Sequence, residues 1–353
     1  MCTFEISRRV AARVAAVVRA AVFGAAVFGT VILPTGSRAA EPPGDLIGQM
    51  RIYVGEADRT LLEVAREQDL GVLEIMAANP GIDPWMPGAG TALLLPSAHV
   101  LPDAEREGIV INLAELRLYY FPGGDAAPVT ATIGIGRQGF TTPLGTTKIV
   151  RKQTDPTWFP TATARAENPA LPAAFPPGPA NPLGKYAFYL GWETYLIHGT
   201  HKPYGVGRRV SRGCIRLYPE RIEQLFRTVE IGTKVTVVSQ PVKLGWQAGE
   251  LYLEVHPDLD QLDELEVSRE FTQRPAAGAE ELILAKAGAA AARLDWARIE
   301  VALAQRLGIP VRITFPQEGR RRLGWPVAAP PPSARAASPG RPAPWAARPS
   351  PGA

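Results

Sequence analysis

The most informative stretch of the chain reads His198-Gly199-Thr200 and, after a short loop, Ser211-Arg212-Gly213-Cys214-Ile215-Arg216-Leu217. His198 ends an apolar, strand-like segment, and Cys214 follows sixteen residues later, beyond a loop that contains glycines. A strand, a glycine loop and a returning segment could bring the two side chains together. An imidazole that takes the proton of a neighbouring thiol turns that thiol into a strong nucleophile. The stretch therefore predicts a cysteine nucleophile with His198 as its base.

The residues around Cys214 suit a reaction at a carbonyl group. Gly213 would allow a substrate to approach the backbone closely, and the N–H groups of Gly213 and Cys214 could receive a developing oxyanion. Arg212 and Arg216 supply charge for a substrate carboxylate, which an arginine can bind through two parallel hydrogen bonds. For Arg216 a structural salt bridge is an equal alternative. His201 is a second candidate base, although a surface histidine is the simpler interpretation.

Residues 1–39 are typical of a signal peptide, with a basic start, an apolar run from Ala20 to Leu33 and small residues near Ala39. An uncleaved N-terminal anchor is the alternative. Because Cys2 lies in this segment, Cys214 would be the only cysteine of the processed chain. A single cysteine excludes a disulfide framework and a cysteine-based metal site.

Residues 317–353 are rich in Pro, Ala and Arg, and we expect them to be disordered. Five arginines stand against one glutamate in residues 1–39, and six against one in residues 317–353. The segment between is therefore net negative, although the whole chain carries +4. The basic balance belongs to the two ends and does not indicate a nucleic-acid partner.

Residues 50–98 predict a small domain with the order strand, helix, helix, strand. A capping box from Thr60 to Glu63 opens the first helix, and Asn79-Pro80-Gly81 ends the second. The segment resembles a LysM domain, a module that binds N-acetylglucosamine-containing glycans. The resemblance rests on Tyr53-Val54, Asp58-x-Thr60-Leu61, Ile75-x-x-x-Asn79-Pro80-Gly81 and Pro87-Gly88 with Leu95-Pro96. A small α/β module without a ligand is the alternative, since fold alone does not establish binding.

Residues 108–239 predict a mainly β domain with one clear helix, from Pro219 to Val229. The spaced glycines at 134–139 fit a dinucleotide pattern, but the residues that follow cannot start a helix, so we interpret them as a strand and a turn. The long loop at 155–182 carries Trp158-Phe159 and many prolines, which favours a wall beside a substrate groove, with simple packing as the alternative. Residues 244–316 predict a small α/β appendage, with a strand at 249–256, helices at 279–291 and 295–307, and a strand at 311–315.

The motif at Cys214 resembles that of the L,D-transpeptidases with a YkuD-type catalytic domain, of the ErfK/YbiS/YcfS/YnhG group. The match includes Thr141-Thr142-Pro143-Leu144-Gly145, Pro156-Thr157-Trp158, Asn181-Pro182-Leu183-Gly184 and residues 198–225 and 249–256. The resemblance implies a YkuD-type β-sandwich with few helices and no metal or organic cofactor. It makes Cys214 the nucleophile and His198 the general base and acid, oriented by the carbonyl of Gly199. The remaining residues it implicates are Ser211, Arg212 and Gly213 near the oxyanion, and Arg216, Trp158 and Tyr204 in substrate binding.

The resemblance also implies the reaction. Cys214 would attack the amide between the L-centre of diaminopimelate and D-alanine in a peptidoglycan tetrapeptide stem, and release D-alanine from a thioester. The acceptor would be another stem, giving a 3→3 crosslink, or an outer-membrane protein. The LysM-like module would hold the enzyme on glycan, and the compartment would be the periplasm. Two alternatives remain open: a hydrolase that uses water as acceptor, and a wall-binding protein whose catalytic domain is idle.

Overall fold

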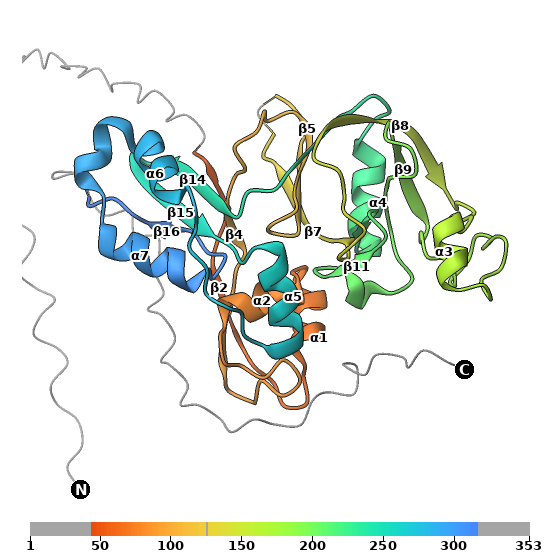
Figure 1. The fold of residues 1–353 in the computed structure, drawn as a ribbon, viewed down its shortest axis with the longest axis horizontal. Coiled ribbons are helices and arrows are strands. Elements are labelled where there is room, and N and C mark those ends of the chain that lie inside the picture. The colour runs from red at the N-terminus through yellow and green to blue at the C-terminus, as the bar shows by residue number, and fades with distance from the viewer. Residues whose placement is uncertain (1–43, 125, 317–353) are drawn as a thin grey trace, which may run out of the picture. The chain divides into compact units, whose positions relative to one another are not determined.

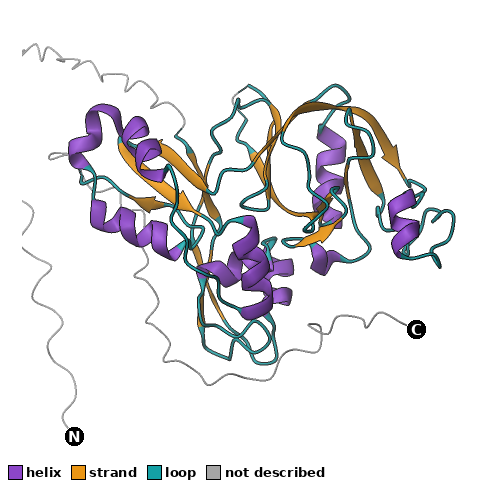
Figure 2. Cartoon of the chain, viewed as in Figure 1, coloured by secondary structure: helices purple, strands orange, loops and turns teal. Residues whose placement is uncertain are grey.

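The computed structural model of the protein describes residues 44–124 and 126–316 (Figure 1). Its largest element is one nine-stranded sheet with the strand order β11-β7-β12-β10-β9-β8-β13-β5-β6. The strands of this sheet are β5 (Gly108–Asn112), β6 (Arg117–Phe121), β7 (Val129–Gly136), β8 (Gly145–Thr154), β9 (Tyr186–Leu190), β10 (Leu196–His198), β11 (Arg209–Ser211), β12 (Ile215–Leu217) and β13 (Lys234–Val238). Strands dominate this part of the chain, as Figure 2 shows, which confirms the mainly β fold with few helices.

The strands form two linked groups: β5, β6 and β13 with the first parts of β7 and β8, and β9, β10 and β12 with their second parts. Strand β6 also pairs with β7, so the sheet closes on itself. The length of β7 explains the closure: residues 129–132 pair with β6, whereas residues 133–136 pair with β12 and β11. Strands β7 and β8 each pass from one group to the other, as strands do at the corners of a β-sandwich. A closed sheet satisfies the backbone groups that two separate sheets would leave at their edges.

Helix α4 (Pro219–Thr228) stabilises the strands that carry the motif residues. It packs on β9 and buries Ile222 and Leu225 in the apolar core of the sheet. The ring of Phe226 lies 4.7 Å from that of Tyr186 and 5.4 Å from that of Phe188, centroid to centroid. Aromatic pairs at these separations are favourable. Strand β9 and its neighbour β10 are thus fixed from one side of the sheet.

The segment expected to form the N-terminal module has the elements in the order β2 (Arg51–Val54), α1 (Leu61–Gln68), α2 (Val72–Ala78) and β3 (Ala92–Leu95), with β2 and β3 antiparallel. Thr60 and Glu63 form the expected capping box. Asn79 is buried and bridges helix and strand: its Nδ2 donates to the carbonyls of Ile75 and Leu94, both at 2.8 Å. An asparagine is needed here because it can donate and accept at the same site.

The module packs against the loop that joins His198 to Cys214. The Tyr218 hydroxyl donates to the carbonyl of Leu70 at 3.0 Å. A Cβ added at Gly207, whose φ is +76°, would lie 2.4 Å from the Cα of Gly71. The backbones of the module and the loop therefore meet at a point where only glycine fits.

The C-terminal segment contains a three-stranded sheet covered by helices. Its elements are β14 (Val242–Gln247), β15 (Glu250–Val255), α6 (Ala279–Ala287), the 3₁₀ helix η2 (Gly288–Arg293), α7 (Trp296–Gln305) and β16 (Val311–Arg312), and Asp295 caps α7 as expected. Helix α5 (Leu259–Ser268) was not expected from the sequence, and neither was β14. Helix α5 leaves the appendage and packs on α2, burying Leu262 and Leu265 in the main core.

The remaining described strands are β1 (Leu46–Gly48) and β4 (Ala98–Val100), which pair with each other. The predicted signal peptide at 1–39 and the predicted tail at 317–353 lie outside the described residues. Among the helices at 44–124 and 126–316, none has the length and apolar character needed to cross a bilayer.

Candidate active site

The predicted base and the predicted nucleophile lie at the ends of two neighbouring strands. Strand β10 ends at His198 and pairs in parallel with β12, which begins directly after Cys214. In this register Ile197 lies opposite Ile215, and His198 opposite Arg216. His198 and Cys214 both line one cavity of about 1280 Å³. Parallel pairing needs a long crossover between the strands, and residues 199–213 supply it.

His198 is held in one orientation and in its neutral form. Its side chain is buried, and Nδ1 lies 2.6 Å from the carbonyl oxygen of Gly199. Burial, and secondly the charge of Arg216, lower the pKa of His198 to about 3. The imidazole is therefore neutral near pH 7, and because Nδ1 donates its proton to the carbonyl, Nε2 keeps a lone pair. His198 is thus a proton acceptor in the resting site.

Cys214 rests as a thiol. Its side chain is partly exposed, and Sγ donates to the carbonyl of Thr194 at 3.5 Å. Burial raises the pKa of Cys214, and this outweighs the opposite influences of a backbone hydrogen bond from Leu196 and the charge of Arg216. The cavity therefore holds a neutral thiol and a neutral imidazole, not a preformed thiolate and imidazolium. The proton must leave Sγ as the nucleophile attacks.

Ser211 and Gly213 shape the loop that precedes the cysteine. The Ser211 hydroxyl donates to the carbonyl of Cys214 at 2.6 Å and accepts from the Gly213 N–H at 3.1 Å. The Gly213 N–H is therefore occupied within the loop, which corrects the expectation that it faces a developing oxyanion. Of the two backbone donors considered, the N–H of Cys214 remains the candidate.

Gly213 is required by conformation and by space. Its φ is +100°, and an added Cβ would lie 2.8 Å from Cε1 of Tyr195. Thr142, from the Thr-Thr-Pro-Leu-Gly segment, donates to the carbonyl of Gly213 at 2.8 Å. The Tyr195 hydroxyl in turn donates to the carbonyl of Thr141 at 3.3 Å. The sequence pattern predicts no role for Thr142 or Tyr195, although Thr142 lies in the segment from Thr141 to Gly145 that matches the family.

The two arginines of the motif have different surroundings. Arg212 forms an ion pair with Glu167. Arg216 lines the cavity, and among the described residues its Nε is buried without a hydrogen-bond partner and its side chain enters no ion pair. The structural salt bridge considered for Arg216 is therefore not found in the described part of the chain. Its charge instead acts on both reacting groups, since it lowers the pKa of Cys214 and that of His198.

Residues 155–182, which we call the lid, form one wall of the cavity. Trp158 and Phe175 pair through their backbones, and their rings lie 5.2 Å apart, centroid to centroid. Both line the cavity. The lid contains the short helix α3 (Ala162–Glu167), which lies beyond the ends of β8 and β9 in Figure 1. Buried Asn181 ties the lid together, because its Nδ2 donates to three carbonyls, of Pro156, Phe175 and Pro176.

Two other candidates differ in position. His201 lines the cavity and is exposed, and burial, then Lys202, lowers the pKa of His201. Tyr204 is 51% exposed, in the 3₁₀ turn η1 (Pro203–Gly205), and is not among the residues that line the cavity. The assignment of Tyr204 to substrate binding therefore stays a prediction, for a residue outside the cavity lining.

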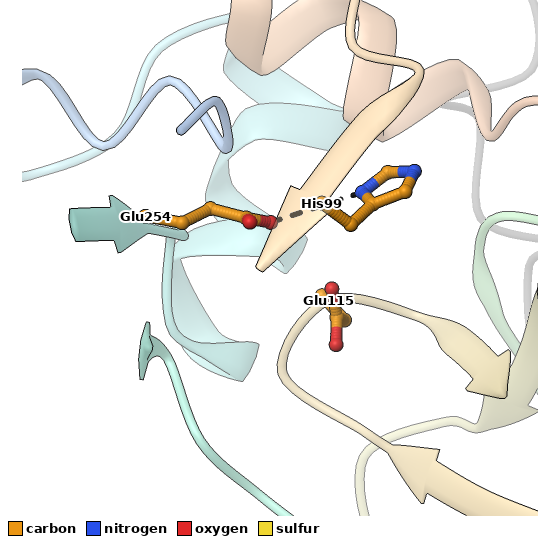
Figure 3. A group of neighbouring side chains, drawn as sticks. All are labelled: His99, Glu115 and Glu254. Carbon is orange, nitrogen blue, oxygen red and sulfur yellow. Dashed lines mark ion pairs between the residues drawn. The ribbon is translucent and has the colours of Figure 1, made fainter. Parts of the chain in front are cut away.

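One group of side chains among the described residues has ligand atoms close enough for a metal ion: His99, Glu115 and Glu254 (Figure 3). The buried ammonium of Lys243 lies 2.5 Å from Glu115 and 3.0 Å from Glu254. Burial alone would raise the pKa of Glu254, but Lys243 and the histidine neighbours hold this pKa well below its usual range. The lysine already supplies the cation that two buried carboxylates need.

Comparisons with known proteins relate the chain to one family. The family model of the YkuD L,D-transpeptidase catalytic domain matches residues 106–237. The chain is 40% identical over 293 residues to the "Probable L,D-transpeptidase YbiS" of Escherichia coli K12, covering 80% of this chain and 92% of that protein. It is 43% identical over 238 residues to "Probable L,D-transpeptidase YcfS" of the same strain, covering 65% and 72%. The NMR structure of the catalytic domain of the E. faecium L,D-transpeptidase is 24% identical and covers 38% of this chain and 99% of its own, with a TM-score of 0.31.

Proposed function

This chain belongs to the L,D-transpeptidases with a YkuD-type catalytic domain, and from that premise we propose how it performs the reaction on peptidoglycan. Cys214 is the nucleophile, His198 the general base and acid, and the donor is a tetrapeptide stem whose diaminopimelate–D-alanine amide enters the cavity beside them. One observation carries the proposal most directly: a neutral imidazole, held through Nδ1 by Gly199, lines the same cavity as the single described thiol, on the neighbouring strand.

The first half of the reaction moves one proton. Sγ of Cys214 attacks the carbonyl carbon of the diaminopimelate–D-alanine amide, while its proton passes to Nε2 of His198. The oxygen of the tetrahedral intermediate takes the negative charge, with the Cys214 N–H as its backbone donor. The imidazolium then returns the proton to the leaving nitrogen, D-alanine departs, and the stem remains as a thioester on Cys214.

Arg216 makes the charged state of His198 short-lived. The guanidinium favours the thiolate and disfavours the imidazolium. Because the charge of Arg216 disfavours the imidazolium, His198 passes its proton readily to the leaving amine. In the second half the acceptor amine attacks the thioester and gives a proton to Nε2 of His198. The C–S bond then breaks, and His198 passes this proton to the departing Sγ, which restores the neutral thiol.

The cavity has room for a peptide donor. Its volume of about 1280 Å³ exceeds the range of roughly 300–1,000 Å³ typical of small-molecule sites. Apolar rings of the lid, Trp158, Phe159 and Phe175, line one part, and the cationic side chains of Arg212 and Arg216 line another. This mixture suits a stem that carries both methyl groups and carboxylates.

Residues 50–98 serve as a glycan-binding domain in this proposal, and the protein acts in the periplasm. Glycan attachment would raise the local concentration of stems at the cavity. The acceptor is a diaminopimelate side chain of a second stem, giving a 3→3 crosslink. An amine of an outer-membrane protein is the second acceptor class, and water would make the enzyme a hydrolase.

Intact-mass measurement with a purified tetrapeptide muropeptide tests the proposal. We expect a thioester adduct of the donor minus D-alanine, which is absent in Cys214→Ala. Added acceptor stem should convert the adduct into a crosslinked dimer, whereas free tripeptide alone would indicate hydrolysis. No adduct, with binding to insoluble peptidoglycan retained, would reduce the protein to a wall-binding role. Deletion of residues 50–98 is unsuitable as a control, because this module packs on the 199–213 loop.

A further inference from the structure

A cluster of one carboxylate and two guanidiniums lies where the lid meets the loop before Cys214. Glu167, the last residue of α3, accepts from Nη2 of Arg137 through both carboxylate oxygens, at 2.8 and 3.0 Å. The same carboxylate accepts from Nη2 of Arg212. Two positive charges thus share one negative charge, and the cluster keeps a net charge of about +1.

Neither arginine belongs to the lid: Arg137 follows β7, and Arg212 lies in the loop before Cys214. The Arg137 N–H donates to the carbonyl of Ser211 at 3.0 Å, which ties the turn after β7 to the residue before Arg212. The ring of Phe140 lies beside both guanidiniums, with its centroid 4.5 Å from Cζ of Arg137 and 5.9 Å from Cζ of Arg212. The ring restrains both planar groups from one side. Only the carboxylate comes from the lid.

Arg212 places one end of this cation pair at the reaction site, whereas Arg137 and Glu167 lie just outside the residues that line the cavity. Arg212 and Phe140 line the same cavity as Cys214. Each guanidinium has five N–H donors, and Glu167 engages one nitrogen of each. The arrangement is that of a carboxylate-binding site whose occupant is a residue of the protein's own lid.

We propose that Arg137 and Arg212 form a site for a substrate carboxylate, that Glu167 occupies this site in the present structure, and that the donor's carboxylate displaces Glu167 and releases that end of the lid. The ligand class is a peptide carboxylate. A tetrapeptide stem carries two candidates close to the scissile amide, on D-alanine and on the D-centre of diaminopimelate. The identity of this ligand, but not the existence of the site, rests on the proposed function.

The exchange requires little energy because all three side chains are partly exposed. The exposed fractions are 43% for Arg137, 38% for Glu167 and 34% for Arg212. Ion pairs at such positions are weak, and one carboxylate can replace another while the same hydrogen bonds re-form. A deeply buried Glu167 would have closed the site permanently.

The site is tested first with two small thiol reagents that differ in one charge. Iodoacetate carries a carboxylate and iodoacetamide does not, and both alkylate Cys214. The measurement is the ratio of their rate constants, followed by mass spectrometry of the Cys214 peptide in the full chain. The variants are Glu167→Gln, Arg137→Gln and Arg212→Gln. Glu223→Gln is the matched control, because it removes an exposed carboxylate paired with an arginine, Arg227, on α4, outside the cavity.

We expect Glu167→Gln to raise the iodoacetate-to-iodoacetamide ratio roughly two- to threefold, the order of a single charge–charge interaction in a water-like dielectric. Arg137→Gln and Arg212→Gln should each lower the ratio by a similar factor, and Glu223→Gln should leave it unchanged. Equal ratios in all five proteins would overturn the proposal. This readout needs no peptidoglycan, so it stands even if no donor thioester is ever observed.

A second measurement identifies the carboxylate. Stem peptides are prepared with a carboxamide either on D-alanine or on the D-centre of diaminopimelate, and KM and kcat are measured for donor acylation. Glu167→Gln should lower KM two- to threefold for the unmodified donor and lose this advantage for the one amide that removes the displacing carboxylate. The same change in KM for all three donors, or a change in kcat alone, would show that Glu167 only restrains the lid.

Discussion

Acid should destabilise this protein through one buried imidazole in particular. His198 has a pKa of about 3 in the folded chain, against an ordinary value of 6.5. In the unfolded chain the imidazole takes up a proton as the pH falls below 6.5, while the folded chain holds it neutral until about pH 3. Acid therefore favours the unfolded state, and the stability is lost progressively as the pH falls through this window.

The magnitude follows from the width of the window. One pKa unit corresponds to 1.36 kcal/mol, so a lowering from 6.5 to about 3 amounts to ~5 kcal/mol over the whole range. Between pH 7 and pH 5 most carboxylates of the protein remain ionised. Over this range the contribution of His198 alone is about 2 kcal/mol. A loss of this size is a large fraction of the stability of an ordinary domain.

Urea unfolding of the wild type, His198→Asn and His201→Asn at pH 7 and pH 5 measures this contribution. The wild type should lose about 2 kcal/mol more than His198→Asn between the two pH values, because the variant has no imidazole to protonate at this position. His201→Asn removes an exposed imidazole from the same cavity and should retain most of the pH dependence. Identical losses in the wild type and His198→Asn would refute the neutral, buried state of His198 and the mechanism built on it.

Three further substitutions test other parts of the site. Gly213→Ala should slow acylation more than tenfold at saturating donor, because the φ of +100° and the contact with Tyr195 both exclude a side chain. Acylation is followed by intact mass, and a wild-type rate would contradict this prediction. Asn181→Ala leaves three carbonyls of the lid without their donor, which should lower the free energy of unfolding by roughly 1–3 kcal/mol. Limited proteolysis within residues 155–182 should become faster, and an unchanged cleavage rate would argue against this role of Asn181. Lys243→Met removes the ammonium that two buried carboxylates share and should destabilise the fold by ~3–5 kcal/mol in urea, although His256 stays 2.7 Å from Glu254; a neutral effect would contradict this role of Lys243.

Much of the local structure was predictable because the signals are local. The capping box at Thr60, the stop at Asn79 and the helix that begins at Pro219 each depend on a few neighbouring residues, and the structure has all three. The interpretation of residues 134–139 as a strand and a turn is also confirmed, since β7 runs to Gly136 and is followed by a turn. The likeness of the motif at Cys214 led to the right family.

The closure of the sheet and the hydrogen-bond pattern of the site were not predictable from local signals. Pairing of β7 with both β6 and β12 depends on contacts between segments far apart in sequence, which strand propensity does not report. The occupied N–H of Gly213 and the exposed ring of Tyr204 depend on loop conformation. Helix α5 was missed because its apolar residues, Leu262 and Leu265, are interrupted by acids and find their partner in the N-terminal module.

The protonated state of Cys214 also bears on how long the enzyme survives. Oxidants such as peroxides and disulfides react with thiolates far faster than with thiols. Burial raises the pKa of Cys214, and His198 does not deprotonate it in advance, so the sulfur stays in its least oxidisable form between turnovers. The nucleophile is generated only when a carbonyl is in place to consume it. Among the described residues Cys214 has no partner cysteine, so it would gain chemical durability from this arrangement in any oxidising environment.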